Sequence, residues 1–334
     1  MSKVSVIMSV YNGEKYLKIA IESILNQTFE NFEFIIINDG STDKTEDIIK
    51  KFMRKDERIC LINNERNVER AESRNKGIKL SKGKYIAMMD ADDISLPQRL
   101  EKEIKFLDNN PKIGLVGSWQ QIKIDENNEF LGINQFPTTD KEIKKRLITN
   151  NKFFLSSIML RKECIEKVGG FREEFIPAED YDMWLRISEE YEVANIPEPL
   201  AKYRTYFNSS SVQRKWEQER YAQLVRELAK ERRELGEDSL QIGDKSKINK
   251  ILKDLSSLSW IEKRRFTANT FYGYGSYLFY NTNSKKRVKK WIKRALLFYP
   301  FVSLNAWRIL AKCYLPSSVV EMIKKVKNRW CRER

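Results

Sequence analysis

Four short apolar runs, each followed by a stretch with helical spacing, dominate the first third of the chain. The runs are Ser5–Val10, Phe32–Asn38, Arg58–Asn63 and Lys84–Met89. Helical patterns follow them near residues 14–26, 43–54, 68–80 and 97–109. Apolar strands separated by helices of about 10 to 15 residues favour parallel pairing through right-handed crossovers. This part of the chain is therefore predicted to fold as a doubly wound α/β sheet.

The pattern becomes more mixed after Pro111. Further strands are predicted at Lys112–Ile124, Glu129–Ile133 and Ser156–Arg161, and short strands around Pro197 and Pro199. An amphipathic helix is predicted over Ala178–Glu190, after a short helix that ends at a pair of glycines. The sheet is therefore expected to be mixed rather than purely parallel.

The net charge of +15 is unevenly distributed along the chain. Residues 214–334 hold 29 Lys and Arg against 12 Asp and Glu, whereas residues 1–213 hold 33 against 35. The later segment also has a helical pattern and many aromatic residues. We therefore predict an α/β domain over residues 1–213 and a helical, basic, aromatic-rich region over residues 214–334.

Composition excludes several classes of catalytic site. The chain has no histidine, which excludes Ser-His-Asp and Cys-His catalysis and leaves acid-base work mainly to Asp, Glu, Lys or Tyr, with the carboxylates as the first candidates. Its four cysteines lie far apart without a CxxC pair, which argues against a zinc site or a disulfide framework and favours a reducing, cytoplasmic compartment. No window approaches the roughly 18 apolar residues of a membrane span, and no secretory signal is expected.

Acidic residues follow two of the predicted strands. Asp39 comes after the second strand, and Asp90, Asp92 and Asp93 come after the fourth. In an open parallel sheet, ligands bind beyond the carboxyl ends of the strands. A lone Asp there is commonly a turn or cap residue, but three acids in four positions repel one another unless a cation neutralises them. Such oxygen ligands suit Mg²⁺ or Mn²⁺ bridging to substrate phosphates, although GxxxxGK[ST] and GxGxxG are both absent.

Three blocks of sequence together resemble a known family. They are SVIMSVYNGEKYLKIAIESILNQTFENFEFIIINDGSTDKT, RAESRNKGIKLSKGKYIAMMDADD and PAEDYDMWLRI. In content, order and spacing they closely resemble the family 2 inverting glycosyltransferases with the GT-A fold, across roughly Lys3 to Tyr206. The resemblance implies a nucleotide-diphospho-sugar transferase fold, with residues 1–213 as the catalytic domain and the basic region as a helical appendage.

The resemblance implies roles for residues at the edge of the sheet. Ser9 and Tyr11 match positions around the nucleotide base, Asp39 matches the acid that contacts the base, and Arg74 matches a residue placed for nucleotide or phosphate contact. The DxD motif matches Asp90-Ala91-Asp92, with Asp90 toward the ribose and Asp92 as the metal ligand. Asp90 and Asp93 are further candidate ligands of the Mn²⁺ or Mg²⁺, and Asp93 is expected to support the motif.

The resemblance also implies that Asp180 is the catalytic base. The base would take a proton from an acceptor hydroxyl as its oxygen attacks the sugar, which inverts the anomeric centre in one displacement. Glu179 is the rival base, and an acid stabilised by the helix dipole is the alternative interpretation of Asp180. Many relatives carry a histidine ahead of this motif or after the YR motif, whereas this chain has none.

The expected function is transfer of a sugar from a nucleotide donor, most readily a UDP-sugar, to a saccharide or lipid-linked acceptor in cell-envelope polysaccharide or glycolipid synthesis. The alternative is a catalytically silent nucleotide-sugar-binding module tethered to a membrane assembly complex.

Lys285–Arg334 is basic, aromatic and amphipathic, which is typical of segments that lie on an anionic membrane surface. Packing against the catalytic domain is the competing interpretation, and nucleic-acid binding is the least favoured. The expected location is cytoplasmic or peripheral on the inner face of the cell membrane.

Overall fold

The computed structural model describes residues 2–206, 208–281 and 284–315, without the side chains of Gln120 and Gln121. Residues 316–334 of the predicted basic tail lie outside the described residues. Two compact units are present. The first comprises the described residues up to Thr205 together with Arg220–Ile248, and the second comprises Tyr206–Glu219 and the described residues from Asn249 onward. The predicted domain boundary between residues 213 and 214 stays a prediction.

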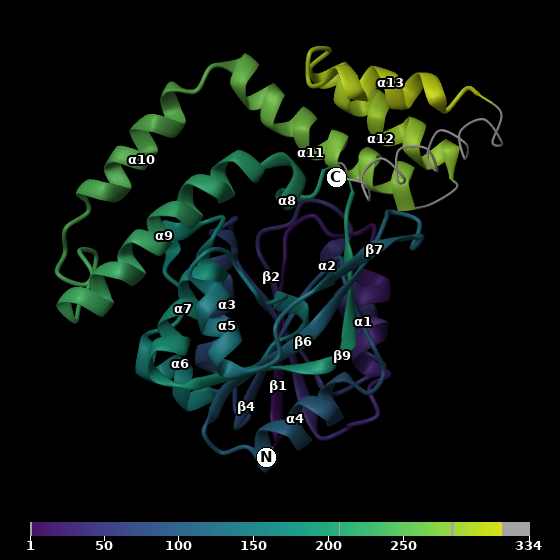
Figure 1. Ribbon diagram of the computed structural model, residues 1–334. Coiled ribbons are helices and arrows are strands. Elements are labelled where there is room, and N and C mark those ends of the chain that lie inside the picture. Colours follow the sequence, from purple (N-terminus) through teal and green to yellow (C-terminus); the bar gives the residue numbers. More distant parts are fainter. Residues whose placement is uncertain (1, 207, 282–283, 316–334) are drawn as a thin grey trace. The chain divides into compact units, whose positions relative to one another are not determined.

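The first unit is built on one mixed sheet (Figure 1). Its strands are β1 (Val4–Val10), β2 (Phe32–Asn38), β3 (Ile59–Asn63), β4 (Tyr85–Asp90), β5 (Ile94–Ser95), β6 (Ile113–Ile124), β7 (Phe130–Gln135), β8 (Met159–Arg161) and β9 (Glu192–Arg204). The order is β3-β2-β1-β4-β8-β6-β9-β5, with β7 paired to β6. Parallel pairs join β1, β2, β3 and β4, and β6 is parallel to β9, while β8 runs antiparallel to β4 and β6. The predicted mixed α/β fold is therefore confirmed.

Helices cover both faces of this sheet. They are α1 (Leu17–Leu25), α2 (Thr45–Met53), α3 (Glu69–Leu80), α4 (Arg99–Asn109), α5 (Asp140–Leu147), α6 (Lys162–Val168) and α7 (Glu179–Glu190), with 3₁₀ turns η1 (Leu155–Ser157) and η2 (Glu173–Phe175). Apolar residues of α1, α2 and α4 share one buried core with alternate residues of β1, β2 and β4. Helix α3 lies on the opposite face, because Ile7 and Ile37 point away from that core toward Gly77 of α3.

Two strand predictions were wrong in detail. The expected strand Ser156–Arg161 begins only at Met159, because Leu155–Ser157 form a 3₁₀ turn in which the Ser157 hydroxyl donates to the Phe154 carbonyl. The short strands expected around Pro197 and Pro199 are parts of one long strand, β9. Proline lacks a donor for the ladder, and the register with β6 shifts opposite this segment. Helix α5 and strand β5 were not predicted.

Close contact between α3 and the sheet depends on Gly77. A Cβ atom at this position would lie 2.7 Å from Cδ1 of Ile37 and 2.8 Å from Cγ2 of Ile7. Only glycine therefore allows the helix backbone to approach β1 and β2 this closely. Arg74, three residues earlier on the same helix, is thereby brought toward the carboxyl edge of the sheet.

The second unit is helical among its described residues. Its helices are α8 (Ser210–Gln213), α11 (Trp260–Asn281), α12 (Lys285–Phe298) and α13 (Leu304–Lys312), while α9 (Lys215–Leu235) and α10 (Ser246–Ser257) each have residues in both units. Trp291 of α12 is buried with ring centroids 5.8 Å from Phe271 and 5.2 Å from Tyr274, both on α11. Among the described residues, every helix is too short or too polar to cross a bilayer.

Arg99 fixes the strand that ends in the acidic motif. It is fully buried, and its Nη2 donates to the carbonyl oxygens of Met88 (2.8 Å) and Ile158 (3.0 Å). Its Nε donates to Oε1 of Glu103 at 3.0 Å, and burial raises the pKa of Glu103 to about 7 even though Arg99 lowers it. Arg99 therefore ties β4 to the segment before β8 from within the core.

We expect the substitution Arg99→Met to lower the free energy of unfolding by about 3 to 5 kcal/mol, because it leaves the buried Glu103 without its cation and removes one donor from the carbonyl groups of Met88 and Ile158. Urea unfolding followed by circular dichroism measures the loss. The double variant Arg99→Met with Glu103→Met should recover part of this loss, since it removes both charges. A single variant as stable as the parent would contradict the role given to Arg99.

Candidate active site

The carboxyl ends of β1, β2 and β4 meet at one edge of the sheet. In the parallel register Ser9 of β1 lies opposite both Ile37 of β2 and Asp90 of β4. The strand ends are therefore level, and the residues that follow them project from the same edge, as the sequence predicted. Tyr11, just beyond β1, is half exposed there.

Hydrogen bonds join the loops after β1 and β2. The Asn12 amide donates to Oγ of Ser41 (3.0 Å), and Oδ1 of Asn12 accepts from the Thr42 amide (2.8 Å). Asn12 has a φ of 50°, in the left-handed region that asparagine tolerates better than most residues. These contacts hold the two loops together at the edge of the sheet.

Asp39 is buried at the end of β2 and is held by the segment after β3. Its Oδ1 accepts from Nδ2 of Asn64 at 2.8 Å and from the backbone amide of Val68 at 3.0 Å. The same Asn64 nitrogen also donates to Oγ of Ser73 on α3, at 2.9 Å. Asp39 is therefore oriented by two donors on a neighbouring loop.

Arg74 connects two acids that are far apart in the sequence. Its side chain is almost fully buried, and Nη2 donates to Oδ1 of Asp90 at 2.8 Å. Its Nη1 donates to Oε1 of Glu179 at the start of α7, also at 2.8 Å. Arg70, one turn earlier on α3, places its Nε 3.0 Å from the same oxygen of Glu179. The sequence placed Arg74 near a nucleotide, and the structure pairs it with these two carboxylates.

The three acids after β4 have different environments. Asp93 is buried, and its Oδ2 accepts from Oγ of Ser156 (2.5 Å) while its Oδ1 accepts from the Arg204 amide (2.8 Å). Burial, and then the charges of Asp92 and Asp90, raise the pKa of Asp93 well above its ordinary value. Asp90 and Asp92 are only partly buried. Asp93 therefore anchors the loop internally, whereas the other two lie nearer the surface.

These acids do not form a closed metal site by themselves. Among the residues that the structure describes, no group of three or more Asp, Glu, Cys or His side chains is arranged to hold a metal ion. Both oxygens of Asp93 and one oxygen of Asp90 already accept hydrogen bonds from protein donors. The arrangement fits a cation that takes one or two carboxylates and completes its shell with substrate phosphates and water, as Mg²⁺ commonly does.

Glu179 and Asp180 are neighbours with opposite electrostatic environments. Burial acts to raise the pKa of Glu179, but the charges of Arg70 and Arg74 outweigh it and hold that pKa below its ordinary value. For Asp180, burial and then the charge of Glu179 raise the pKa to about 6. Glu179 is thus a neutralised structural anion, and Asp180 is a carboxylate able to exchange a proton near neutral pH.

Asp180 is oriented by two donors. Its Oδ1 accepts from the backbone amide of Tyr181 at 2.7 Å, and its Oδ2 accepts from Nδ2 of Asn151 at 3.1 Å. Asn151 lies in the loop between α5 and η1. Because each oxygen has one fixed donor, the carboxylate is held in place while each oxygen keeps a second lone pair.

Sequence reasoning missed four residues that build this site. They are Arg70, Asn151, Ser156 and Arg204. Arg204 is fully buried, and its Nε donates to the Asp92 carbonyl at 2.7 Å. Arg204 belongs to the YR motif, so its place in the family's pattern was the signal that could have marked it. Asn151 and Ser156 lie in a segment without periodicity, so no comparable signal marked them.

A sequence profile of the family described as "Glycosyl transferase family 2" matches residues 5–169. An uncharacterized glycosyltransferase of Methanocaldococcus jannaschii is 45% identical over 207 residues, which are 60% of this chain and 70% of that protein. An uncharacterized glycosyltransferase of Haemophilus influenzae is 32% identical over 87% of this chain and 97% of its own length. The O-antigen biosynthesis glycosyltransferase WbnJ of Escherichia coli is 36% identical over 63% of this chain and 82% of its own.

Two solved structures share the fold at low sequence identity. Staphylococcus aureus TarS 1-349 in complex with UDP-GlcNAc has a TM-score of 0.54 at 18% identity, covering 99% of this chain and 92% of that one. The mannosyltransferase PcManGT from Pyrobaculum calidifontis, in complex with GDP-Man and Mn²⁺, has a TM-score of 0.53 at 17% identity, covering 98% and 87%. These likenesses support the fold alone.

We expect Glu179→Gln to lower the pKa of Asp180 from about 6 toward its ordinary value. The substitution removes a neighbouring negative charge and leaves Arg70 and Arg74 to favour the ionised carboxylate. Carbon-13 NMR of labelled aspartate carboxyl groups measures the titration directly, with Asp180→Asn identifying the signal. An unchanged or raised pKa in Glu179→Gln would contradict this electrostatic interpretation.

Proposed function

The chain belongs to glycosyl transferase family 2, and we propose that it moves a sugar from a nucleoside-diphosphate donor to a hydroxyl group of a saccharide or lipid-linked acceptor. One observation carries the proposal. Arg74 pairs with both Asp90, at the strand edge, and Glu179, whose neighbour Asp180 has a pKa raised to about 6. Acids suited to donor binding and an acid suited to proton transfer are thus joined by one residue.

The donor is proposed to bind at the edge formed by β1, β2 and β4. Ser9 and Tyr11 would contact the nucleotide base, Asp39 would accept a hydrogen bond from it, and Asp90 would face the ribose. Proteins of this fold have been solved with UDP-GlcNAc and with GDP-Man, which supports a nucleotide-sugar donor. We propose a UDP-sugar as the donor. Arg74 would act on the donor indirectly, by holding the carboxylate of Asp90.

Asp92 is the proposed ligand of a Mn²⁺ or Mg²⁺ ion, with Asp90 as a second ligand and Asp93 as their internal support. When bound, the ion would neutralise charge that develops on the departing diphosphate. The neighbour solved with Mn²⁺ supports metal use within this fold. The chain's own contribution is to hold the two partly exposed acids on a loop fixed by Ser156 and Arg204.

Asp180 is the proposed general base. It would accept the proton of the acceptor hydroxyl while the acceptor oxygen bonds to the anomeric carbon and the bond from that carbon to the diphosphate breaks. A pKa near 6 leaves the carboxylate mostly ionised at neutral pH yet basic enough to take part of the proton in the transition state. Attack from the face opposite the leaving group inverts the anomeric configuration.

Relatives support a role in polysaccharide assembly. One of them is named for O-antigen biosynthesis and another for amylovoran biosynthesis. We therefore propose cell-envelope polysaccharide or glycolipid synthesis as the process. The rival proposal, a catalytically silent binding module, requires that donor binding be retained without any turnover.

The second unit is proposed to bind an anionic membrane surface. Large apolar side chains around the α12–α13 turn are exposed, with Leu297 at 74%, Phe301 at 82% and Leu304 at 78% of their full area. Lys293 lies one turn before Leu297 on the same side of α12, so cations accompany these apolar groups. Exposed apolar residues beside lysines favour the interface of an anionic bilayer, which would place the enzyme peripherally on the inner face of the cell membrane.

We expect Asp180→Asn to reduce sugar transfer by about 10² to 10⁴-fold, because the amide cannot accept the acceptor proton. Nucleotide affinity, measured by calorimetry with UDP, should stay within about twofold, since Asp180 lies outside the proposed donor contacts. Glu166→Gln, at an exposed acid of α6, is the matched control and should leave both quantities unchanged. Equal transfer rates for Asp180→Asn and the unmodified protein would rule out this base.

We expect the pair Phe301→Ser and Trp307→Ser to reduce co-sedimentation with phosphatidylglycerol vesicles, because both exposed rings are lost. The matched control is Leu235→Ser with Ile242→Ser, which replaces two exposed apolar residues in the first unit. This control should co-sediment with the vesicles as much as the unmodified protein does. The membrane-docking proposal would be contradicted if the first pair left vesicle co-sedimentation unchanged, or if the unmodified protein did not co-sediment at all.

A further inference from the structure

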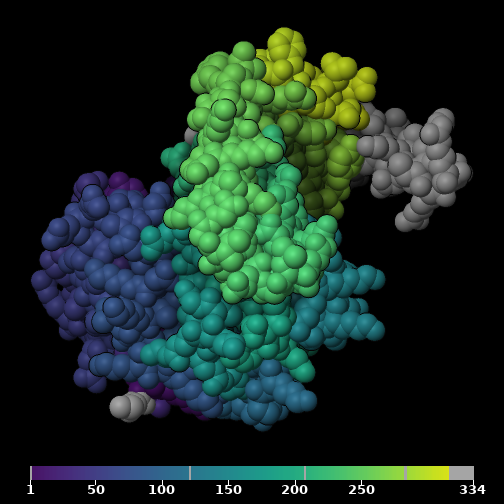
Figure 2. All heavy atoms as spheres, turned by 90° about the vertical axis from the view of Figure 1, so that its left-hand side faces the viewer, coloured from purple at the N-terminus to yellow at the C-terminus, as the bar shows by residue number. Residues whose placement is uncertain are grey.

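A concave basic surface lies in the first unit, beside α5, α6, α7 and the end of α9. It encloses a cavity of about 730 Å³. Six cationic residues line it, and two lining residues are acidic, Glu189 and Glu190. The cations are Lys144, Lys145, Lys167, Arg186, Arg232 and Arg233. We call this surface the basic groove; Figure 2 views the molecule from the side on which α6 and α7 lie in Figure 1.

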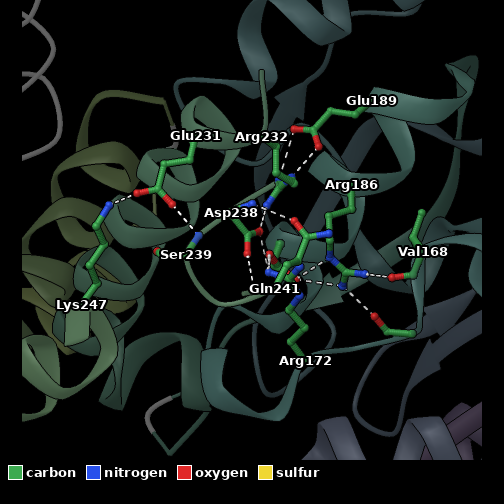
Figure 3. Close-up of polar contacts among 12 residues, drawn as sticks. Val168, Arg172, Arg186, Glu189, Glu231, Arg232, Asp238, Ser239, Gln241 and Lys247 are labelled. Carbon is green, nitrogen blue, oxygen red and sulfur yellow. Dashed lines mark hydrogen bonds and ion pairs between the residues drawn. The ribbon is translucent and has the colours of Figure 1, made fainter. Parts of the chain in front are cut away.

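The floor of the basic groove is a balanced ion-pair network (Figure 3). Arg186 places its Nε 2.9 Å from Oδ2 of Asp182 and also donates to the carbonyl oxygens of Val168 and Gly170. Arg232 donates through Nε to Oε2 of Glu189 at 2.6 Å. Asp238 accepts from both Arg232 and Arg172. Three arginines and three carboxylates therefore neutralise one another and fix the floor, so they supply shape rather than excess charge.

The rim of the basic groove has three exposed cations and one exposed acid, Glu190, so positive charge is in excess there. Lys145, Lys167 and Arg233 are exposed. Among the described residues, no carboxylate lies within 4.0 Å of these three cations, whereas Lys144 pairs with Asp140 at 3.1 Å. Like charges gathered around a concavity concentrate a positive potential inside it. The basic groove is thus suited to an anion.

The basic groove and the proposed catalytic base share helix α7. Helix α7 begins with Glu179 and Asp180 and reaches the groove at Glu189, a span of about 14 Å along its axis. The Tyr181 hydroxyl donates to the Leu147 carbonyl at the end of α5, next to the groove residue Ile148. Three residues further on, Asn151 donates to Asp180. The same two helices therefore form the groove and position the base.

We propose that the basic groove binds an anionic acceptor chain, one that carries phosphate or carboxylate groups, while a hydroxyl of that chain lies at Asp180. This inference rests on the proposed glycosyltransferase function. The nucleotide donor is assigned to a different place, the edge of β1, β2 and β4. A concave groove accommodates a single extended chain, whereas a bilayer meets flat or convex surfaces, which separates this surface from the apolar α12–α13 turn.

The test compares anionic and neutral chains on the intact protein. Fluorescein-labelled oligogalacturonate supplies carboxylates, labelled linear polyphosphate supplies phosphates, and labelled maltoheptaose is the uncharged reference. Fluorescence anisotropy should show binding of at least one anionic probe and weaker binding of maltoheptaose. The comparison of the two anions identifies which acidic group the groove prefers.

Charge reversal at the rim locates the binding. The triple variant Lys145→Glu, Lys167→Glu and Arg233→Glu should weaken anion binding by about tenfold or more, because the local potential changes sign. The matched control reverses three exposed lysines on α2, α3 and α4, namely Lys51→Glu, Lys79→Glu and Lys105→Glu. It should weaken binding far less, although the net charge changes equally. Equal losses in both triple variants, or no anion binding by the unmodified protein, would overturn the proposal.

A separate readout keeps this inference distinct from the proposed function. UDP affinity and donor hydrolysis without acceptor should be the same in the rim variant and the unmodified protein, since the rim lies outside the donor contacts. If the donor is turned over but the affinity for the anion is the same in the rim variant and the unmodified protein, the groove proposal alone fails. If anion binding follows the rim charges but no donor is turned over, the glycosyltransferase proposal fails, the bound anion is not an acceptor, and only anion binding by the groove stands.

Discussion

The buried guanidinium of Arg74 is the contact on which the candidate site depends. It donates to Asp90 at the end of β4 and to Glu179 at the start of α7, two acids separated by 89 positions in the sequence. The helix that carries Arg74 reaches this position because Gly77 lets α3 pack against Ile7 and Ile37. Without this cation, Glu179 would keep only Arg70 as a partner, and Asp90 would lose the donor that ties it to α3. Arg74 therefore joins the proposed donor edge to the helix that carries the proposed base.

The acids of the site differ in function because their partners differ, although their chemistry is the same. Asp93 is held by Ser156 and Arg204 inside the protein, and Glu179 is neutralised by Arg70 and Arg74. Asp180 stands next to Glu179 but has a pKa raised to about 6, because burial and its neighbour's charge act against ionisation. Asp180 is therefore the carboxylate of this pair that we propose for proton transfer. The second acid of the pair is occupied with arginines, so it is not available as a nucleophile.

The sequence predicted much of this arrangement and missed the contacts that link its parts. The strands β1 to β4 followed from apolar runs of fixed length, and the level ends of those strands followed from parallel pairing. The pairing of Arg74 with Glu179 could not be inferred, since a contact across 105 residues depends on tertiary packing rather than on local pattern. Asn151 and Ser156 were missed for the same reason. The single long strand β9 was also hidden, because two prolines interrupt the period by which a strand is recognised.

The central claim is that one carboxylate, Asp180, acts as a base in a single displacement and that no other acid forms a covalent intermediate. The anomeric configuration of the first product tests this claim most directly. With an α-linked UDP-sugar donor and an acceptor that the enzyme uses, proton NMR during the early reaction should show a β-linked product. An α-linked product would mean that configuration is retained, and it would contradict the role assigned to Asp180 and Glu179.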